Sequence, residues 1–162
     1  MEKPGGELRG SARRVQEALH AAGVSLKVVE LPESTRTAAE AARAVGCEVG
    51  QIAKSLVFRG RQSGRAILIV ASGAHRVDEG KVSAQIGEPL QIAPPDFVRA
   101  ETGFAIGGVP PLGHTKPLAT YIDRALLQHE VIWAAAGTPH AVFRLRPEDL
   151  IAITGGEVIE VA

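Results

Sequence analysis

The sequence predicts an α/β fold of the α+β type, in which helices pack on a mixed or largely antiparallel β-sheet. The chain has 162 residues, of which 45% are hydrophobic, so it has the size of one domain and can bury a substantial core. Helical and strand patterns are interspersed, yet several connections between predicted strands are too short to hold a crossover helix. We therefore do not expect a doubly wound parallel sheet.

The first predicted elements are a helix and a short strand. Ser11 is placed as the N-cap of a helix whose apolar residues recur at helical spacing up to Gly23. Residues 26–31, LKVVEL, then form a strand. Residues 1–10 are polar and rich in glycine, so we expect a flexible N-terminal segment before a single domain that spans residues 11–162.

A capped helix and a hairpin follow. Thr37 and Glu40 have the spacing of a capping box at the start of the second helix, which Gly46 ends. Strands at residues 56–59 and 66–72 flank a hairpin turn. The second of these strands, AILIVAS, is apolar enough to be buried on both faces.

The second half of the chain alternates helices and strands around one irregular loop. Residues 104–114, FAIGGVPPLGH, contain paired glycines and paired prolines, so they cannot form regular structure. The other predicted elements are helices that begin near Asp78 and Pro94, strands at residues 119–123, 131–137 and 141–145, a helix at 146–156 and a last strand at 157–161.

Charge and composition limit the classes of function. The formal net charge is zero, so the total charge gives no argument for nucleic-acid binding. Between Lys54 and Lys81 there are six basic residues against two acidic ones, a stretch that suits phosphate contacts or, equally, a solvated hairpin. Cys47 is the single cysteine, and the sequence has neither a signal-peptide pattern nor eighteen consecutive apolar residues. We therefore expect a cytoplasmic protein without a disulfide or a membrane span.

Lys54 is the first candidate for chemistry, because it stands between apolar residues at the mouth of a predicted strand. In one interpretation its stem packs on the sheet while its amine reaches water, and the spacing alone favours this. In the other, its ammonium group binds a carbonyl or phosphate oxygen, or desolvation lowers its pKa and it acts as a base. Ser55 would point to the opposite face of the strand, so we do not expect a Ser–Lys dyad.

The glycine-rich loop is the second candidate. Gly107 and Gly108 would let backbone N–H groups approach a ligand and form an oxyanion hole, unless the loop is only a tight structural turn. The five histidines are far apart and match no metal-binding spacing, so we expect neither a metal nor another cofactor. We expect Cys47 to be a packed or idle thiol.

Three segments, in this order, resemble the YbaK/ProX family of aminoacyl-tRNA editing domains. They are STRTAAEAARAVGCEVGQIAKSLVF, FAIGGVPPLGH and WAAAGTPHAVFRLRPEDL. The family includes free-standing deacylases and the editing insertion of bacterial-type prolyl-tRNA synthetases. The resemblance implies a mixed, partly closed β-sheet or barrel flanked by helices, as a single YbaK/ProX-like domain.

The resemblance also implies an activity. These proteins hydrolyse, in trans, the ester of a mischarged aminoacyl-tRNA, and the expected substrate is tRNA-Pro that carries a small non-cognate amino acid such as Cys or Ala. The acceptor end of the tRNA is then the main partner, and prolyl-tRNA synthetase is a further one. The alternative is a non-catalytic module of the same fold that binds tRNA or a synthetase.

Site residues follow from the same resemblance. The family's functional lysine falls on Lys54, near the aminoacyl ester or the terminal adenosine, and its glycine loop falls on Gly107 and Gly108, whose backbone would cradle the aminoacyl carbonyl. The other expected substrate-binding residues are Ser34, Thr35, Arg36, Thr37, Ser72, His75, Ile106, Val109, His114, Ala136 and Gly137. Some cysteine-specific members have an acidic residue where this chain has Val142, which weakens the case for cysteine.

Overall fold

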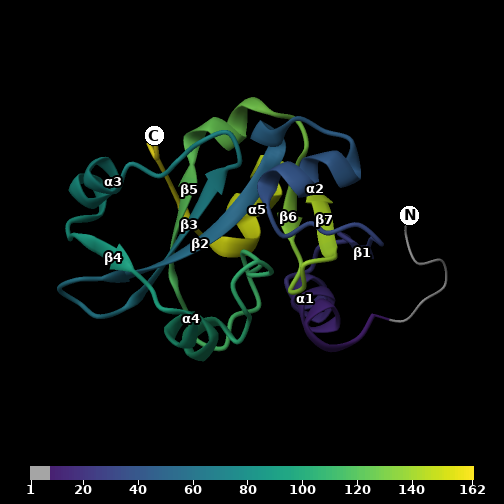
Figure 1. Cartoon of the computed structure of the whole chain (residues 1–162), viewed down its shortest axis with the longest axis horizontal. Coiled ribbons are helices and arrows are strands. Elements are labelled where there is room, and N and C mark those ends of the chain that lie inside the picture. The colour runs from purple at the N-terminus through teal and green to yellow at the C-terminus, as the bar shows by residue number, and fades with distance from the viewer. Residues whose placement is uncertain (1–7) are drawn as a thin grey trace.

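The chain folds into one mixed β-sheet with helices on its faces. The computed structural model describes residues 8–162. Figure 1 shows the strands running through the centre of the molecule, with helices above, below and behind them. The predicted fold class, α/β with a mixed sheet, is confirmed.

The bounds of the elements are as follows. The α-helices are α1 (Gly10–Ala21), α2 (Ala38–Val45), α3 (Glu79–Ile86), α4 (Pro95–Thr102) and α5 (Pro147–Thr154). Short 3-10 helices are η1 (Val49–Gln51) and η2 (Arg124–Gln128). The strands are β1 (Val28–Glu30), β2 (Ile52–Gly60), β3 (Ala66–Ser72), β4 (Leu90–Ile92), β5 (Ala119–Asp123), β6 (Ile132–Ala135), β7 (Ala141–Leu145) and β8 (Glu157–Ile159).

Helix ends agree with the prediction where the signal is local. Thr37 caps α2, and its capping box with Glu40 is formed, while Gly46 ends this helix in the left-handed conformation with φ 77°. The helix predicted after Ser11 is present as α1, but its predicted N-cap was wrong: the helix already includes Gly10, and Arg9 stands at the N-cap without a side-chain hydrogen bond. Residues 1–7 of the predicted N-terminal segment lie outside the described residues.

The sheet joins parallel and antiparallel pairs. Its strand order is β1-β7-β6-β2-β3-β5-β8, and β4 pairs with β2 beside this path. The pairs β2/β6, β3/β5 and β5/β8 are parallel, and the others are antiparallel. β4 was not predicted, and β2 is longer than predicted, because its two ends are completed by partners that are distant in sequence.

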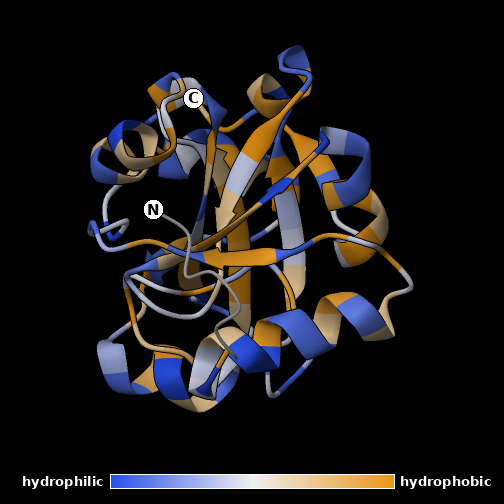
Figure 2. Ribbon diagram, turned by 90° about the vertical axis from the view of Figure 1, so that its right-hand side faces the viewer, coloured by the Kyte–Doolittle hydropathy of each residue, from blue (hydrophilic) through white to orange (hydrophobic). Residues whose placement is uncertain are grey.

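Each face of the sheet has its own apolar cluster. Ala53, Leu68 and Val70 belong to the larger cluster, which α1, α4 and α5 cover, whereas Ile67 and Ile69 pack with α3 on the opposite face. α2 packs with Ile52 in a third cluster. Figure 2 shows hydrophobic colours on the central strands and hydrophilic colours on the outer sides of the helices and in many of the loops.

Candidate functional site

The sheet has a gap along one edge of β2. β3 pairs with the other edge from Ala53 to Arg59 without interruption. On the gapped edge, β6 pairs with residues 52–53 and β4 pairs with residues 58–60. Within the described chain, therefore, residues 54–57 have no strand beside them on this edge.

The backbone of Ser55 faces this gap. Consecutive residues of a strand direct their N–H and C=O groups to opposite edges. Gly60 N–H donates to the carbonyl oxygen of Arg65, and Gly73 N–H donates to that of Ile52, so the even-numbered residues of β2 bond toward β3. The N–H and C=O of Ser55 consequently point into the space between β6 and β4.

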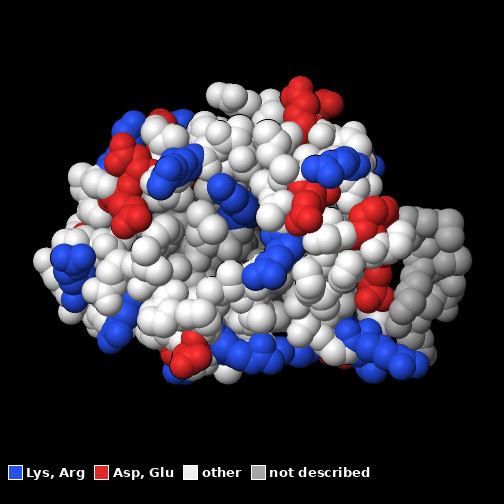
Figure 3. All heavy atoms as spheres, viewed as in Figure 1, with Lys and Arg blue, Asp and Glu red and all other residues white. Residues whose placement is uncertain are grey.

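A cavity of about 460 Å³ occupies the gap, a size typical of small-molecule sites. It is lined from both faces of the sheet, mostly by apolar side chains of β2, β4, β6, α2 and α4. Lys54 and Arg36 are the cations in its lining, which contains no carboxylate. Figure 3 shows a hollow on this face of the molecule with Lys and Arg side chains at its rim. The site therefore suits a small, partly apolar ligand that presents an anionic or carbonyl oxygen to these cations.

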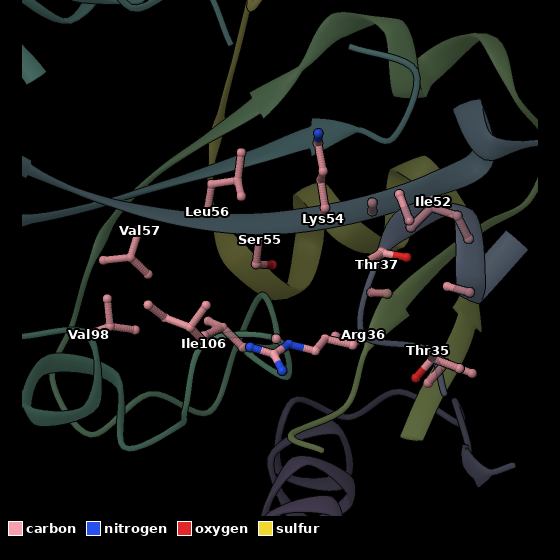
Figure 4. Close-up of a pocket in the computed structure, with 18 of the residues that line it drawn as sticks. Thr35, Arg36, Thr37, Ile52, Lys54, Ser55, Leu56, Val57, Val98 and Ile106 are labelled. Carbon is pink, nitrogen blue, oxygen red and sulfur yellow. The ribbon is translucent and has the colours of Figure 1, made fainter. Parts of the chain in front are cut away.

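Lys54 and Ser55 leave β2 on opposite faces, as predicted for adjacent strand residues, so they form no dyad (Figure 4). Lys54 shares its face with Leu56, and Ser55 shares its face with Val57. Lys54 is half-buried and forms no ion pair with any described residue. The Lys54 ammonium group is therefore free to meet an anionic or carbonyl oxygen at the cavity.

The two loop glycines have different surroundings. Gly107 lines the cavity with φ 98°, and a Cβ on it would lie 2.9 Å from Arg36 Cγ. Its N–H has no partner among the described residues. Gly108, in contrast, donates its N–H to Ala105 and accepts at its oxygen from Gly137 N–H at 2.8 Å. The carbonyl-binding role expected for both glycines is open only to the N–H of Gly107.

Residues 34–37 form one wall, and their side chains divide between structure and cavity. The hydroxyls of Ser34 and Thr37 both donate to the carboxylate of Glu40. Hydrogen bonds from the Thr37 backbone N–H, and then from the hydroxyls, lower the pKa of Glu40. Thr35 and Arg36 line the cavity and are available to a ligand. Thr35 is 6% exposed, and its Oγ1 has no hydrogen-bond partner in the described chain.

The turn after β6 supports this wall from behind. Its Pro139 accepts from Thr35 N–H at 2.6 Å, and the Nδ1 of its His140 lies 2.9 Å from the carbonyl oxygen of Glu33. Ala136 is fully buried and, like Gly137, does not line the cavity. These two residues therefore hold the surrounding loops in place and do not form part of the cavity surface.

Ser72 and His75 are not brought to the cavity. Both bond to Asp123, a carboxylate that is only 1% exposed: Ser72 donates its N–H at 3.0 Å, and His75 Nδ1 lies at 2.8 Å. The Ser72 hydroxyl donates to Gly50 at 2.8 Å. This group ties the end of β3 to the end of β5.

His114 closes the glycine-rich loop on itself. Its Nε2 donates to the carbonyl oxygen of Pro110 at 2.7 Å, and its ring meets Phe104 edge to face. Burial lowers the pKa of His114, and the hydrogen bond to Pro110 opposes this only in part. His114 does not line the cavity, whereas Ile106 and Val109, from the same loop, do.

Sequence reasoning missed Ser55 as a lining residue. Its Oγ is shielded from solvent and has no hydrogen-bond partner in the described chain. Strand alternation places Ser55 opposite Lys54, but only the positions of β4 and β6 reveal that the β2 edge is open there. Val142 also lines the cavity, so an apolar side chain stands there in place of a carboxylate.

Two further findings concern metals and membranes. Across residues 8–162, no three His, Cys, Asp or Glu side chains gather in a way that could hold a metal ion. None of the helices in this same range has the length and apolar character needed to cross a membrane.

Comparison with known proteins gives the family. The model of the aminoacyl-tRNA editing domain matches residues 32–153. The chain is 34% identical over 123 residues to YwhH, an uncharacterized protein of Bacillus subtilis (strain 168), covering 76% of this chain and 78% of that protein. It is 28% identical over 130 residues to EbsC of Enterococcus faecalis (strain ATCC 700802 / V583), a candidate Cys-tRNA(Pro)/Cys-tRNA(Cys) deacylase, covering 80% and 79%.

Comparison with solved structures points to the same family. A crystal structure described as a candidate trans-editing enzyme for prolyl-tRNA synthetase is 56% identical, with a TM-score of 0.90 over 96% of this chain and 98% of that one. The hypothetical protein APE2540 is 28% identical, with a TM-score of 0.84 over 91% and 98%. The chain therefore belongs to the aminoacyl-tRNA editing domain family, and its enzyme class is that of an aminoacyl-tRNA deacylase.

Proposed function

We propose that this protein acts in trans, in the cytoplasm, on tRNA-Pro mischarged with a small non-cognate amino acid such as Cys or Ala. The cavity in the β2 gap carries this proposal, because its size suits a small side chain and its mostly apolar lining offers two cations and no carboxylate. The choice of tRNA is supported by two similar proteins: the name of EbsC contains Cys-tRNA(Pro), and the 56% identical crystal structure is described as a candidate trans-editing enzyme for prolyl-tRNA synthetase.

The reaction is hydrolysis of the ester between the amino acid and the terminal ribose. Water adds to the ester carbonyl, the bond from the carbonyl carbon to the ribose oxygen breaks, and the ribose oxygen receives a proton. An aminoacyl ester is already activated, so positioning and stabilisation of the oxyanion matter more than a strong base. Gly107 N–H is the donor for this oxyanion, since Gly108 N–H is already bonded.

The cations hold the tRNA side of the substrate. Lys54 contacts the substrate near the ester or the terminal adenosine. Arg36, whose side chain passes Gly107, lines the same cavity from the other side of β2. Basic residues between Arg59 and Lys81 extend this contact to the acceptor stem. Prolyl-tRNA synthetase is a further partner, because the enzyme corrects an error of that synthetase.

The first test is a panel of tRNA-Pro esters of Cys, Ala, Ser, Thr and Pro, incubated with the wild-type protein and with Lys54→Ala. We expect one non-cognate ester to be lost selectively and Lys54→Ala to slow this about 10- to 100-fold, the effect of removing a charged hydrogen bond. Lys27→Ala, an exposed lysine outside the cavity lining, is the matched control and keeps the wild-type rate.

Other outcomes are equally informative. If every ester survived at the buffer rate, the protein would be a binding module for tRNA or a synthetase. If Lys54→Ala lost stability but kept its rate per folded molecule, Lys54 would be a structural residue.

A further inference from the structure

We propose that Ser55 determines which amino acid is removed, by pairing with the aminoacyl group as a neighbouring strand residue would. The inference rests on the proposed function and adds the class of side chain: small, and ending in a hydrogen-bonding atom, as in Ser or Cys. The free edge of β2 and the unpartnered hydroxyl of Ser55 carry it.

The backbone of Ser55 offers one donor and one acceptor at the spacing of a strand. An α-amino acid has the complementary pair, because its amino group donates and its ester carbonyl accepts. In an antiparallel sheet, two directly opposed residues exchange both bonds in this manner. The carbonyl oxygen keeps a second lone pair, to which Gly107 N–H can donate.

This pairing fixes the direction of the substrate side chain. Residues opposed across two strands have side chains on the same face, with Cβ atoms about 5 Å apart. The aminoacyl side chain therefore lies beside the Ser55 side chain, on the face that Val57, Val98 and Ile106 share (Figure 4). Lys54, on the other face, does not contact it.

The surroundings of Ser55 on that face are apolar apart from hydroxyls and the Arg36 side chain (Figure 4). Val98 and Val109 are 2% and 5% exposed, and Ser55 Oγ itself is shielded from solvent. Thr35 Oγ1 is a second unpartnered hydroxyl in the lining of the same cavity. A buried hydroxyl without a partner is unfavourable, so a ligand that supplies a partner gains more than one that supplies a methyl group.

Ser55 is free to respond to such a ligand. Its Oγ makes no hydrogen bond in the described chain, so rotation about χ1 toward the cavity breaks none. For the same reason Ser55→Ala removes an unpartnered group and is expected to fold with unchanged stability. The variant therefore reports on the substrate rather than on the fold.

The experiment compares single-turnover hydrolysis of Ser-, Cys- and Ala-tRNA-Pro by wild type and Ser55→Ala. We expect wild type to prefer the Ser or Cys ester over the Ala ester, and Ser55→Ala to lower the ratio of the Ser or Cys rate to the Ala rate about 3- to 10-fold. Ser83→Ala is the control, since Ser83 is half-buried on α3 and outside the cavity lining.

A second readout separates this inference from the proposed function. Binding of seryl and alanyl amides of 3′-amino-3′-deoxyadenosine requires no hydrolysis. A Ser55-dependent preference for the seryl amide supports the inference even if no ester is cleaved. Equal losses for all three esters, or no change in preference in either assay, would overturn it while leaving the deacylase intact.

Discussion

At the scale of single residues, the hydroxyl side chains around the cavity have different roles. Ser34 and Thr37 give their hydroxyls to Glu40, whereas Thr35 and Ser55 keep theirs without a partner beside the cavity. Residue type therefore does not reveal which hydroxyl meets the substrate. The hydrogen-bond partners are more informative, because a hydroxyl that already donates within the protein must break that bond before it can bind a ligand.

His114 makes stability depend on pH. Its pKa is lowered in the folded protein, so between the folded value and the unfolded value of about 6.5 the unfolded chain binds more protons. Stability is therefore complete above pH of about 6.5 and falls as the pH drops toward the folded pKa. We expect His114→Gln to remove this loss in denaturation curves measured from pH 5 to 8.

The control for this titration is His20→Gln, because His20 is exposed on α1 and forms no side-chain hydrogen bond in the described chain. It should keep the wild-type pH dependence. An identical slope in both variants would show that another group titrates.

At the scale of elements, the contact between the glycine-rich loop and the turn after β6 holds the site together. A Cβ on Gly108 would lie 2.9 Å from the backbone of Gly137 and Thr138, and backbone atoms cannot yield as a flexible side chain does. We expect Gly108→Ala to lower the free energy of unfolding by about 1–3 kcal/mol in chemical denaturation.

Gly80→Ala is the matched control. Gly80 lies in α3, where an added Cβ would meet nothing closer than 3.6 Å, so alanine should leave stability unchanged or raise it by about 0.5–1 kcal/mol. If both substitutions changed the free energy of unfolding equally, the close approach of the two loops would not contribute to stability.

The elements also show how far the sequence could predict this protein. The capping box of α2 and the exact limits of β5 and β7 follow from residues adjacent in the chain. β4 and the first residues of β2 depend on partners tens of residues away. Ser72 and His75 were expected at the substrate, but Asp123, 48 residues beyond His75, places them elsewhere.

At the scale of the whole molecule, a net charge of zero coexists with an anionic substrate. In the proposed function, recognition of the tRNA depends on local cations, namely those at the cavity and the basic stretch from Arg59 to Lys81. We expect the affinity for tRNA-Pro to fall as salt rises, with a log–log slope reduced by about 1 for each phosphate-binding cation removed.

Arg61→Ala and Arg65→Ala, both near the β2–β3 turn, test this slope in filter-binding titrations at several salt concentrations. Lys27→Ala is the control for loss of one positive charge. A slope that stays at the wild-type value in both arginine variants would place the acceptor stem on another surface.

The gap in the sheet also limits the length of what can enter. Four residues of β2 span about 13 Å, and β6 and β4 close the two ends. A single aminoacyl unit fits between them, whereas a growing polypeptide on its tRNA would run into one strand or the other. The opening that accepts a mischarged amino acid is therefore too short for a peptide, so we expect the enzyme not to hydrolyse peptidyl-tRNA.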